Sequence, residues 1–206
     1  MDLETFLALL PIVLASLTLH ELAHAYVAWR LGDPTAKQEG RLTLNPIVHV
    51  DPFGALMFVL TALLAGLPFG WARPVPVNPG YFKRAKEGMA VVAAAGPAMN
   101  FALALVCLAV IRHLEPSGLA FEVAEKAYIV NVVLGLFNLV PVPPLDGSRI
   151  VGAVMDNATY ARWTRLDEVG MIAVFGLFFL FRGEFTRLLG DALVEITRVL
   201  DVLVLA

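Results

Sequence analysis

Several long apolar runs constrain this chain more than any other feature, because each is close to the roughly 20 residues that a helix needs to cross a bilayer. The sequence is 59% hydrophobic and 16% charged, whereas a soluble domain is about 25% charged. No polar stretch between the runs is long enough for a separate soluble domain. We therefore expect an all-α polytopic membrane protein, in which a bundle of about four to six transmembrane helices forms one integral domain over residues 1–206.

The apolar runs set the expected helices, which turn residues and prolines separate. We expect helices over residues 3–31, 88–111, 128–140, 170–181 and 185–206, with a shorter apolar segment at 53–67. The last helix is expected to be amphipathic, because its charged residues recur every three or four positions on one stripe: Arg187, Asp191, Glu195, Arg198 and Asp201. The chain then divides into a core over about residues 1–155 and C-terminal helices over about residues 166–206.

Basic residues predict the orientation, because Lys and Arg favour the cytosolic side of a membrane. They gather after the first helix, before the 88–111 helix and after a proline-rich break: Arg30, Lys37, Arg41, Arg73, Lys83, Arg84, Lys86, Arg149, Arg162 and Arg165. These loops are expected to be cytosolic. The connection that contains Glu115, Glu122 and Glu125 is then expected outside.

Residues 53–67 have basic loops on both sides, so we expect a re-entrant or shallow hairpin on the cytosolic side; a plain transmembrane helix is the alternative. The alternating pattern of GRLTLNP, residues 40–46, predicts a short strand. The proline-rich stretch WARPVPVNPGYF, residues 71–82, is expected to be extended. Together these stretches form the β-like part of the predicted fold.

Composition and the N-terminus narrow the function classes. The net charge is −3 and there is no basic tract, so nucleic acid is not an expected partner. Cys107 is the single cysteine and lies in an apolar run, which argues against a cysteine-rich metal site. The first residues, MDLETF, lack the basic region of a secretory signal, so we expect the first helix to be retained.

The motif HELAH, from His20 to His24, lies at the end of an apolar run. On a helix both imidazoles reach one metal ion, and Glu21 stands close enough to act on water bound there. A charged residue such as Asp or Arg inside a membrane helix costs roughly 2.5 to 3.5 kcal/mol. A divalent cation would satisfy all three side chains; the alternative is two interfacial histidines that bond to water. His24 lies six residues before Arg30, which places the cluster on the order of 10 Å inside the cytosolic boundary.

A catalytic zinc takes three protein ligands and leaves a fourth position for water, so a third ligand is required. The candidates are His49, Asp51, His113 and Asp146. His113 is expected at the outer face, whereas Asp146 follows prolines that break a span on the cytosolic side. Backbone freed at membrane depth is tolerated where it lines a cavity. Asp146 is therefore the favoured ligand, with an N-cap of the next helix as the alternative. His49 is expected to be a surface loop residue rather than a partner of a zinc ligand.

Three motifs together resemble the site-2 protease family of intramembrane zinc metalloproteases. They are HELAH in the first helix, AAAGPAMNF in the 88–111 helix and FNLVPVPPLDGSR at the proline break, and they occur in the family's order. The resemblance implies that His20, His24 and Asp146 hold one Zn²⁺ ion and that Glu21 is the general base. It covers most of the chain, up to about residue 155.

Two asparagines complete the candidate site through the same resemblance. Asn138 matches a family position implied to bind the substrate strand or the oxyanion. Asn100 occupies a variable polar position after Gly96 and Pro97, where helix packing is an equal alternative. The stretches NPIVHVDPFG and ARPVPVNP resemble a compact bacterial branch, so neither a PDZ domain nor a regulatory domain is expected.

The expected function is hydrolysis of a peptide bond within or near a transmembrane helix of another membrane protein, in the cell membrane, with the active site nearer the cytosolic side. The expected cofactor is one zinc ion. Residues 40–46 and 74–79 either pair with an unwound substrate strand or form a cap over the zinc cavity. A metal transporter and a non-proteolytic membrane scaffold are the alternative functions. The chain shows no internal repeat of the transporter kind, and a pure binding role needs no Glu21.

Overall fold

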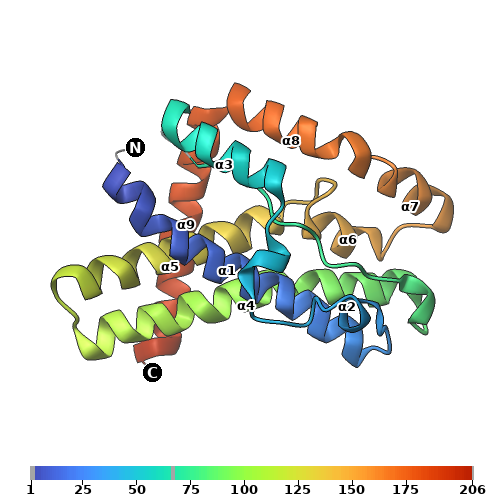
Figure 1. Cartoon of the computed structure of the whole chain (residues 1–206), viewed down its shortest axis with the longest axis horizontal. Coiled ribbons are helices and arrows are strands. Elements are labelled where there is room, and N and C mark those ends of the chain that lie inside the picture. The colour runs from blue at the N-terminus through green and yellow to red at the C-terminus, as the bar shows by residue number, and fades with distance from the viewer. Residues whose placement is uncertain (1–2, 66–67, 206) are drawn as a thin grey trace.

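A computed structural model describes residues 3–65 and 68–205, and that part of the chain is mostly helical (Figure 1). The α-helices are α1 (Leu3–Arg30), α2 (Thr35–Gln38), α3 (Pro52–Ala65), α4 (Ala85–Leu114), α5 (Gly118–Asn138), α6 (Asp146–Gly152), α7 (Asn157–Thr164), α8 (Asp167–Leu180) and α9 (Arg182–Leu205). Two short 3₁₀ turns, η1 (Pro46–His49) and η2 (Pro79–Tyr81), interrupt the loops. The all-α fold predicted from the sequence is confirmed over these residues.

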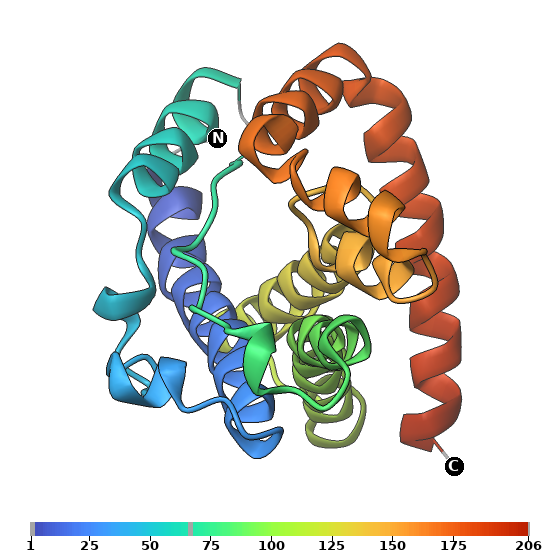
Figure 2. The same cartoon turned by 90° about the vertical axis from the view of Figure 1, so that its right-hand side faces the viewer.

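The centre of the fold is a group of three long helices, in which α4 packs against both α1 and α5 and α1 also contacts α5 (Figure 2). Small residues recur on the buried face of α4, including Ala93, Gly96 and Ala104. Where these small residues lie, helix backbones can approach closely, which is how helices associate in lipid. The three helices therefore form the scaffold on which the HELAH segment is held.

Two of these helices, α1 and α4, are long and apolar enough to cross a membrane. At about 1.5 Å per residue, the 28 residues of α1 and the 30 of α4 each exceed a hydrocarbon core of roughly 30 Å. The number of crossings beyond these two stays a prediction.

Helix α5 begins ten residues earlier than the predicted start at residue 128. Glu122 and Glu125 therefore lie on its first turns, so the expectation that they belong to the connection is wrong, and their location outside stays a prediction. Glutamate is a good helix former, and Lys126 Nζ lies 3.4 Å from Glu122 Oε2, the i,i+4 pairing that supports an exposed helix. The connection between α4 and α5 is reduced to residues 115–117.

Helix α3 and the residues after it form a hairpin. Thr61 Oγ1 accepts from Phe69 N at 2.7 Å, so the chain returns along α3. Glycine is required at this close approach, because a Cβ on Gly54 would lie 2.1 Å from the Trp71 carbonyl oxygen. The 14 residues of α3 span only about 21 Å, less than the roughly 30 Å of a hydrocarbon core. Re-entry from the cytosolic side stays a prediction, and residues 66 and 67 lie outside the described residues.

The strand predicted over residues 40–46 is wrong, because these residues form bends that lead into η1. The Asn45 side chain accepts from Ile47 N at 3.1 Å, and Pro46 starts the turn, so local capping replaces strand pairing. In the described part of the chain, β-pairing is limited to an isolated antiparallel bridge between Val50 and Ala72. The proline-rich stretch is extended as predicted over residues 73–78, which we call the proline strap, whereas its end forms the turn η2.

Helix α9 packs beside the α4–α5 pair (Figure 2). The Arg112 guanidinium contacts both Asp201 oxygens, at 2.8 and 3.0 Å, and Tyr128 Oη lies 2.6 Å from Thr197 Oγ1. Of the charged stripe expected on this helix, Asp201 faces the bundle, while the other four members are exposed: Arg187, Asp191, Glu195 and Arg198. The stripe therefore turns mainly away from the protein interior.

Asp33 ties the end of α1 to the proline strap and is fully buried. Its Oδ1 accepts from Thr35 N at 3.0 Å, and its Oδ2 accepts from Asn78 N at 2.6 Å. We expect Asp33→Ala to lower the free energy of unfolding by about 2 kcal/mol, because two backbone N–H groups lose a charged, buried acceptor. Chemical denaturation in detergent micelles measures this loss.

The matched control is Asp156→Ala, which removes an exposed acceptor that caps α7 through Ala158 N and Thr159 N. A lost exposed cap costs about 1 kcal/mol. If Asp33→Ala costs no more than Asp156→Ala, the buried tie contributes little and the expectation is contradicted.

Candidate metal centre

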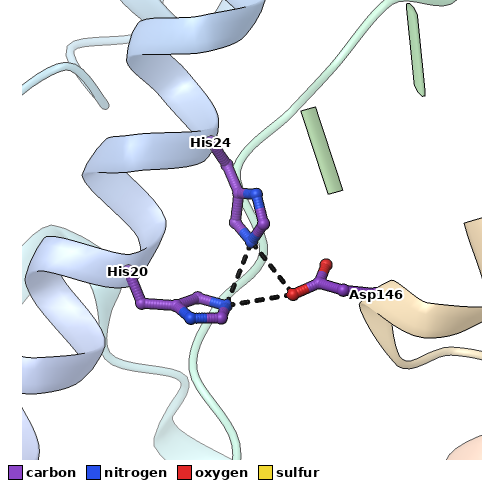
Figure 3. A group of neighbouring side chains, drawn as sticks. All are labelled: His20, His24 and Asp146. Atoms are coloured by element: carbon purple, nitrogen blue, oxygen red, sulfur yellow. Dashed lines mark hydrogen bonds and ion pairs between the residues drawn. The ribbon is translucent and has the colours of Figure 1, made fainter. Parts of the chain in front are cut away.

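The two histidines of HELAH lie near the C-terminal end of α1 and face the same side of the helix (Figure 3). Both are buried, with 4% of His20 and 8% of His24 exposed. Their Nε2 atoms are 3.0 Å apart. The i,i+4 spacing on a continuous helix therefore brings two imidazoles to one point, as predicted.

Asp146 comes from the other side of the site, at the first turn of α6 (Figure 3). Its Oδ2 lies 3.2 Å from His20 Nε2 and 3.3 Å from His24 Nε2. The backbone folds tightly here, because a Cβ on Gly147 would lie 2.2 Å from the Leu139 carbonyl oxygen. The N-cap position of α6 is Leu145, so the alternative reading of Asp146 as that cap is not supported.

Hydrogen bonds on the far side of each imidazole define which nitrogen carries the proton. His24 Nδ1 lies 2.7 Å from the Val92 carbonyl oxygen, which only accepts, so Nδ1 donates and Nε2 of the neutral ring is bare. His20 Nδ1 lies 2.6 Å from Asn100 Oδ1 and donates in the same way. Both lone pairs therefore point at Asp146 Oδ2, which is buried and has no hydrogen-bond partner.

Three acceptor atoms that converge in this way require a positive charge between them, supplied by an added proton or a metal ion. Among the residues that the structure describes, His20, His24 and Asp146 form the one group of metal-ligand type. Zinc about 2.0 to 2.1 Å from each ligand, at tetrahedral angles, separates the ligand atoms by about 3.3 Å. The observed separations of 3.0 to 3.3 Å fit this geometry, and three protein ligands leave a fourth position for water.

Gly96 on α4 closes the site from the third side. A Cβ at this position would lie 2.4 Å from His24 Nε2 and 2.5 Å from His20 Nε2. No side chain other than hydrogen fits beside the two imidazoles. Gly96 lies four residues after Val92 and four before Asn100, so one stripe of α4 carries all three contacts with the histidines.

Glu21 is buried beside the two ligands, with 8% of its surface exposed. Its Oε2 accepts a hydrogen bond from Val75 N, in the proline strap, at 3.0 Å. Arg41 Nη2 donates to the Arg73 carbonyl oxygen at 2.6 Å, which fixes the start of the strap. Burial lowers the pKa of Arg41, and the charge of Glu21 opposes that shift. The candidate base thus lies under the strap.

The other candidate ligands serve other contacts. His49 is 2% exposed and its Nε2 bonds the Thr43 carbonyl oxygen at 3.1 Å, so the expectation of a surface loop histidine is wrong. Asp51 Oδ1 accepts from Gly54 N at the start of α3. His113 Nε2 bonds the Val204 carbonyl oxygen at 2.9 Å, which ties α4 to α9.

Asn138 ends α5 and is half-buried. Its Nδ2 donates to the Leu134 carbonyl oxygen, one turn earlier, at 3.0 Å. The predicted role in binding the substrate or the oxyanion stays a prediction.

Sequence reasoning did not find the contacts of Val92, Gly96 and Asn131; the i,i+4 spacing within the 88–111 helix was the available signal for the first two.

The fold and this site together define a membrane-embedded metallopeptidase. A model for peptidase family M50 matches residues 113–182. YwhC of Bacillus subtilis, named provisionally as a zinc metalloprotease, is 42% identical in an alignment of 175 positions that covers 81% of this chain and 77% of YwhC. The chain belongs to peptidase family M50, the site-2 protease family.

More distant relatives agree with this assignment. Rip2 of Mycolicibacterium smegmatis, also named provisionally as a zinc metalloprotease, is 35% identical over 65% of this chain and 52% of its own length. The zinc metalloprotease MJ0392 of Methanocaldococcus jannaschii is 30% identical over 75% of this chain and 37% of its own length. No solved structure gave a significant match.

We expect Gly96→Ala to abolish zinc binding or weaken it by more than the roughly 10- to 100-fold that follows loss of a ligand's supporting contact. The added methyl group would occupy the space of the two Nε2 atoms. Competition with a chromophoric chelator measures the zinc affinity of the purified protein. Gly176→Ala is the control, because a Cβ there meets nothing within 4 Å. Equal affinities of Gly96→Ala and the wild type would contradict this placement of the imidazoles.

Proposed function

We propose that this chain is an intramembrane zinc metalloprotease that hydrolyses peptide bonds within or near transmembrane segments of other membrane proteins. The observation that carries the proposal is the convergence of three acceptor atoms, from His20, His24 and Asp146, beside the buried Glu21 carboxylate. The two histidines and Glu21 lie on α1, a helix apolar enough to cross a membrane. Membership of family M50 supports the same reaction.

The residue roles follow from the geometry of the site. His20, His24 and Asp146 would hold one zinc ion, which when bound supplies a Lewis acid and an activated water at neutral pH. Glu21 takes the proton of the attacking water on its carboxylate and later delivers it to the nitrogen of the leaving amine. Asn138 is proposed to donate to the substrate carbonyl oxygen as negative charge develops there, a role that elsewhere contributes about 3 to 4 kcal/mol.

The proline strap is proposed to cap the zinc site rather than to offer a free edge strand. Three of its N–H groups already donate within the protein: Arg73 to the His49 carbonyl oxygen, Val75 to Glu21 and Asn78 to Asp33. Pro74 and Pro76 have no N–H to offer. An extended substrate therefore meets a strap with few free donors. Val75 N–H occupies one acceptor position of the Glu21 carboxylate, and the carboxylate keeps further positions that can take a proton from water.

A cavity of about 540 Å³ is proposed to receive the substrate segment. It lies between α1, α3, α5 and α9, and its lining is mostly apolar, including Leu17, Phe58, Val133 and Leu193. The candidate metal ligands and Glu21 do not line it, so a substrate segment held there would have to extend past the cavity to reach them. An apolar lining suits a transmembrane segment, whose side chains are themselves apolar. The substrate class that follows is a membrane protein with a transmembrane helix that unwinds locally to expose its backbone.

We propose a multi-pass location in the cell membrane, with the active site nearer the cytosolic side. The support is the position of His24, six residues before the basic end of α1 at Arg30. We also propose that residues 1–206 form a single catalytic domain, with a core over about residues 1–155. The contacts of α4 with α1, α5 and α6 tie that core together. Neither alternative, transporter or scaffold, gains support from the comparisons.

We expect Glu21→Gln to retain zinc and to lower kcat by roughly 10² to 10⁴, the usual contribution of a general base. An amide cannot take the proton, yet it still accepts a hydrogen bond from Val75 N–H. The assay incubates the purified enzyme in liposomes with a panel of single-span membrane proteins and identifies fragments by mass spectrometry. Zinc per chain is measured on the same samples.

Glu39→Gln is the matched control, since Glu39 is an exposed carboxylate in the same half of the chain. It should cleave at the wild-type rate. Cleavage by Glu21→Gln at the wild-type rate would exclude Glu21 as the base, and a wild-type protein that holds no zinc would exclude the metal site itself.

A further inference from the structure

A line of buried polar side chains leads away from the zinc site into the helix bundle. Behind His20 lies Asn100 on α4, then Asn131 on α5 and Ser16 on α1. Asn100 Nδ2 donates to Asn131 Oδ1 at 3.0 Å, and Asn131 Nδ2 lies 3.0 Å from Ser16 Oγ. None of the three is more than 3% exposed. Each amide would cost several kcal/mol in an apolar interior without these partners.

The far end of this line fixes the direction of every hydrogen bond in it. Asn131 Nδ2 also lies 2.9 Å from the Ala127 carbonyl oxygen, which can only accept. Asn131 must therefore present its NH₂ group to Ala127 and its Oδ1 to Asn100. Asn100 in turn must present its NH₂ group to Asn131, which leaves its Oδ1 facing His20.

The orientation of the Asn100 amide in turn sets the tautomer of His20, a proposed zinc ligand. Because Asn100 offers His20 an acceptor, the imidazole must carry its proton on Nδ1, and Nε2 is left with its lone pair toward Asp146. If the Asn100 amide were reversed, its NH₂ group would face Nδ1 and favour the opposite tautomer, in which Nε2 carries a proton and cannot bind a metal. The Ala127 carbonyl oxygen on α5 therefore determines, through the two asparagines, that Nε2 of His20 carries no proton.

We propose that Asn131 is a positioning residue for the zinc ligand His20, acting through Asn100. Asn131 does not touch the metal ligands; it holds the Asn100 amide in the one orientation that frees His20 Nε2. The same network assigns both polar atoms of Asn100 to structural contacts, which favours a supporting role for Asn100 over donation to the oxyanion. The inference rests on the proposed zinc site.

Asn131 also joins the two halves of the site. It lies seven residues before Asn138, the end of α5, and the break that follows delivers Asp146. Two helical turns, about 10 Å, therefore separate the residue that orients one ligand from the segment that supplies another. A displacement of α5 would disturb His20 and Asp146 together.

The test compares Asn131→Leu with Tyr128→Phe in the full-length protein in detergent. Leucine has nearly the shape of asparagine but neither donates nor accepts, so Asn100 is free to reverse. Tyr128→Phe removes a half-buried hydrogen bond of α5, the 2.6 Å contact with Thr197, which has no link to His20. Zinc affinity is measured by chelator competition, and the visible spectrum of the Co²⁺ form reports ligand geometry.

We expect Asn131→Leu to weaken zinc binding roughly 10- to 100-fold and to change the Co²⁺ spectrum, as loss of a ligand's supporting contact does elsewhere. Tyr128→Phe should keep the wild-type affinity and spectrum. Wild-type values for Asn131→Leu, or an equal loss in both variants, would overturn the positioning role. If the wild type itself binds neither metal, the proposed zinc site fails instead.

Discussion

The convergence of three lone pairs on one point is the constraint on which the rest of this structure depends. His20, His24 and Asp146 present acceptor atoms within 3.3 Å of one another, with no donor between them. Such a group is unstable in a buried site unless a cation neutralises it. Two of these atoms come from α1 and the third from α6, so a bound ion also joins segments separated by more than a hundred residues of sequence. Metal binding and the local fold are therefore coupled.

A buried polar site requires that every supporting group be satisfied within the protein. One stripe of α4 satisfies the two histidines. The Val92 carbonyl accepts from His24, the Asn100 side chain accepts from His20, and Gly96 between them leaves room for both rings. The glycine brings α4 close enough for its neighbours on the stripe to reach the histidines. The requirement explains why α4, which supplies no ligand, packs against α1, α5 and α6 at once.

The sequence predicted the long helices and the convergence of the three candidate metal ligands, because both depend on local patterns or distinctive motifs. The i,i+4 spacing of His20 and His24 needs only one helix, and Asp146 stood out at a proline break. The failures arose where tertiary contacts decide. Residues 40–46 alternate like a strand, yet the Asn45 cap and Pro46 turn them into η1. The burial of His49 and the pairing of Asn100 with Asn131 depend on which helices meet, and no spacing within one segment encodes that.

The site is held unequally on its two sides, and this difference bears on how a substrate enters. The two histidines are fixed to α4 by hydrogen bonds that bridge buried helices. The proline strap, in contrast, is extended backbone tied by single hydrogen bonds to Glu21, Asp33, His49 and Arg41. Each such bond contributes only about 0.5 to 1.5 kcal/mol net, or somewhat more to a charged group. Opening the strap would therefore break these bonds and the buried contacts of Val75, while the hydrogen bonds that hold the two histidines to α4 stay in place.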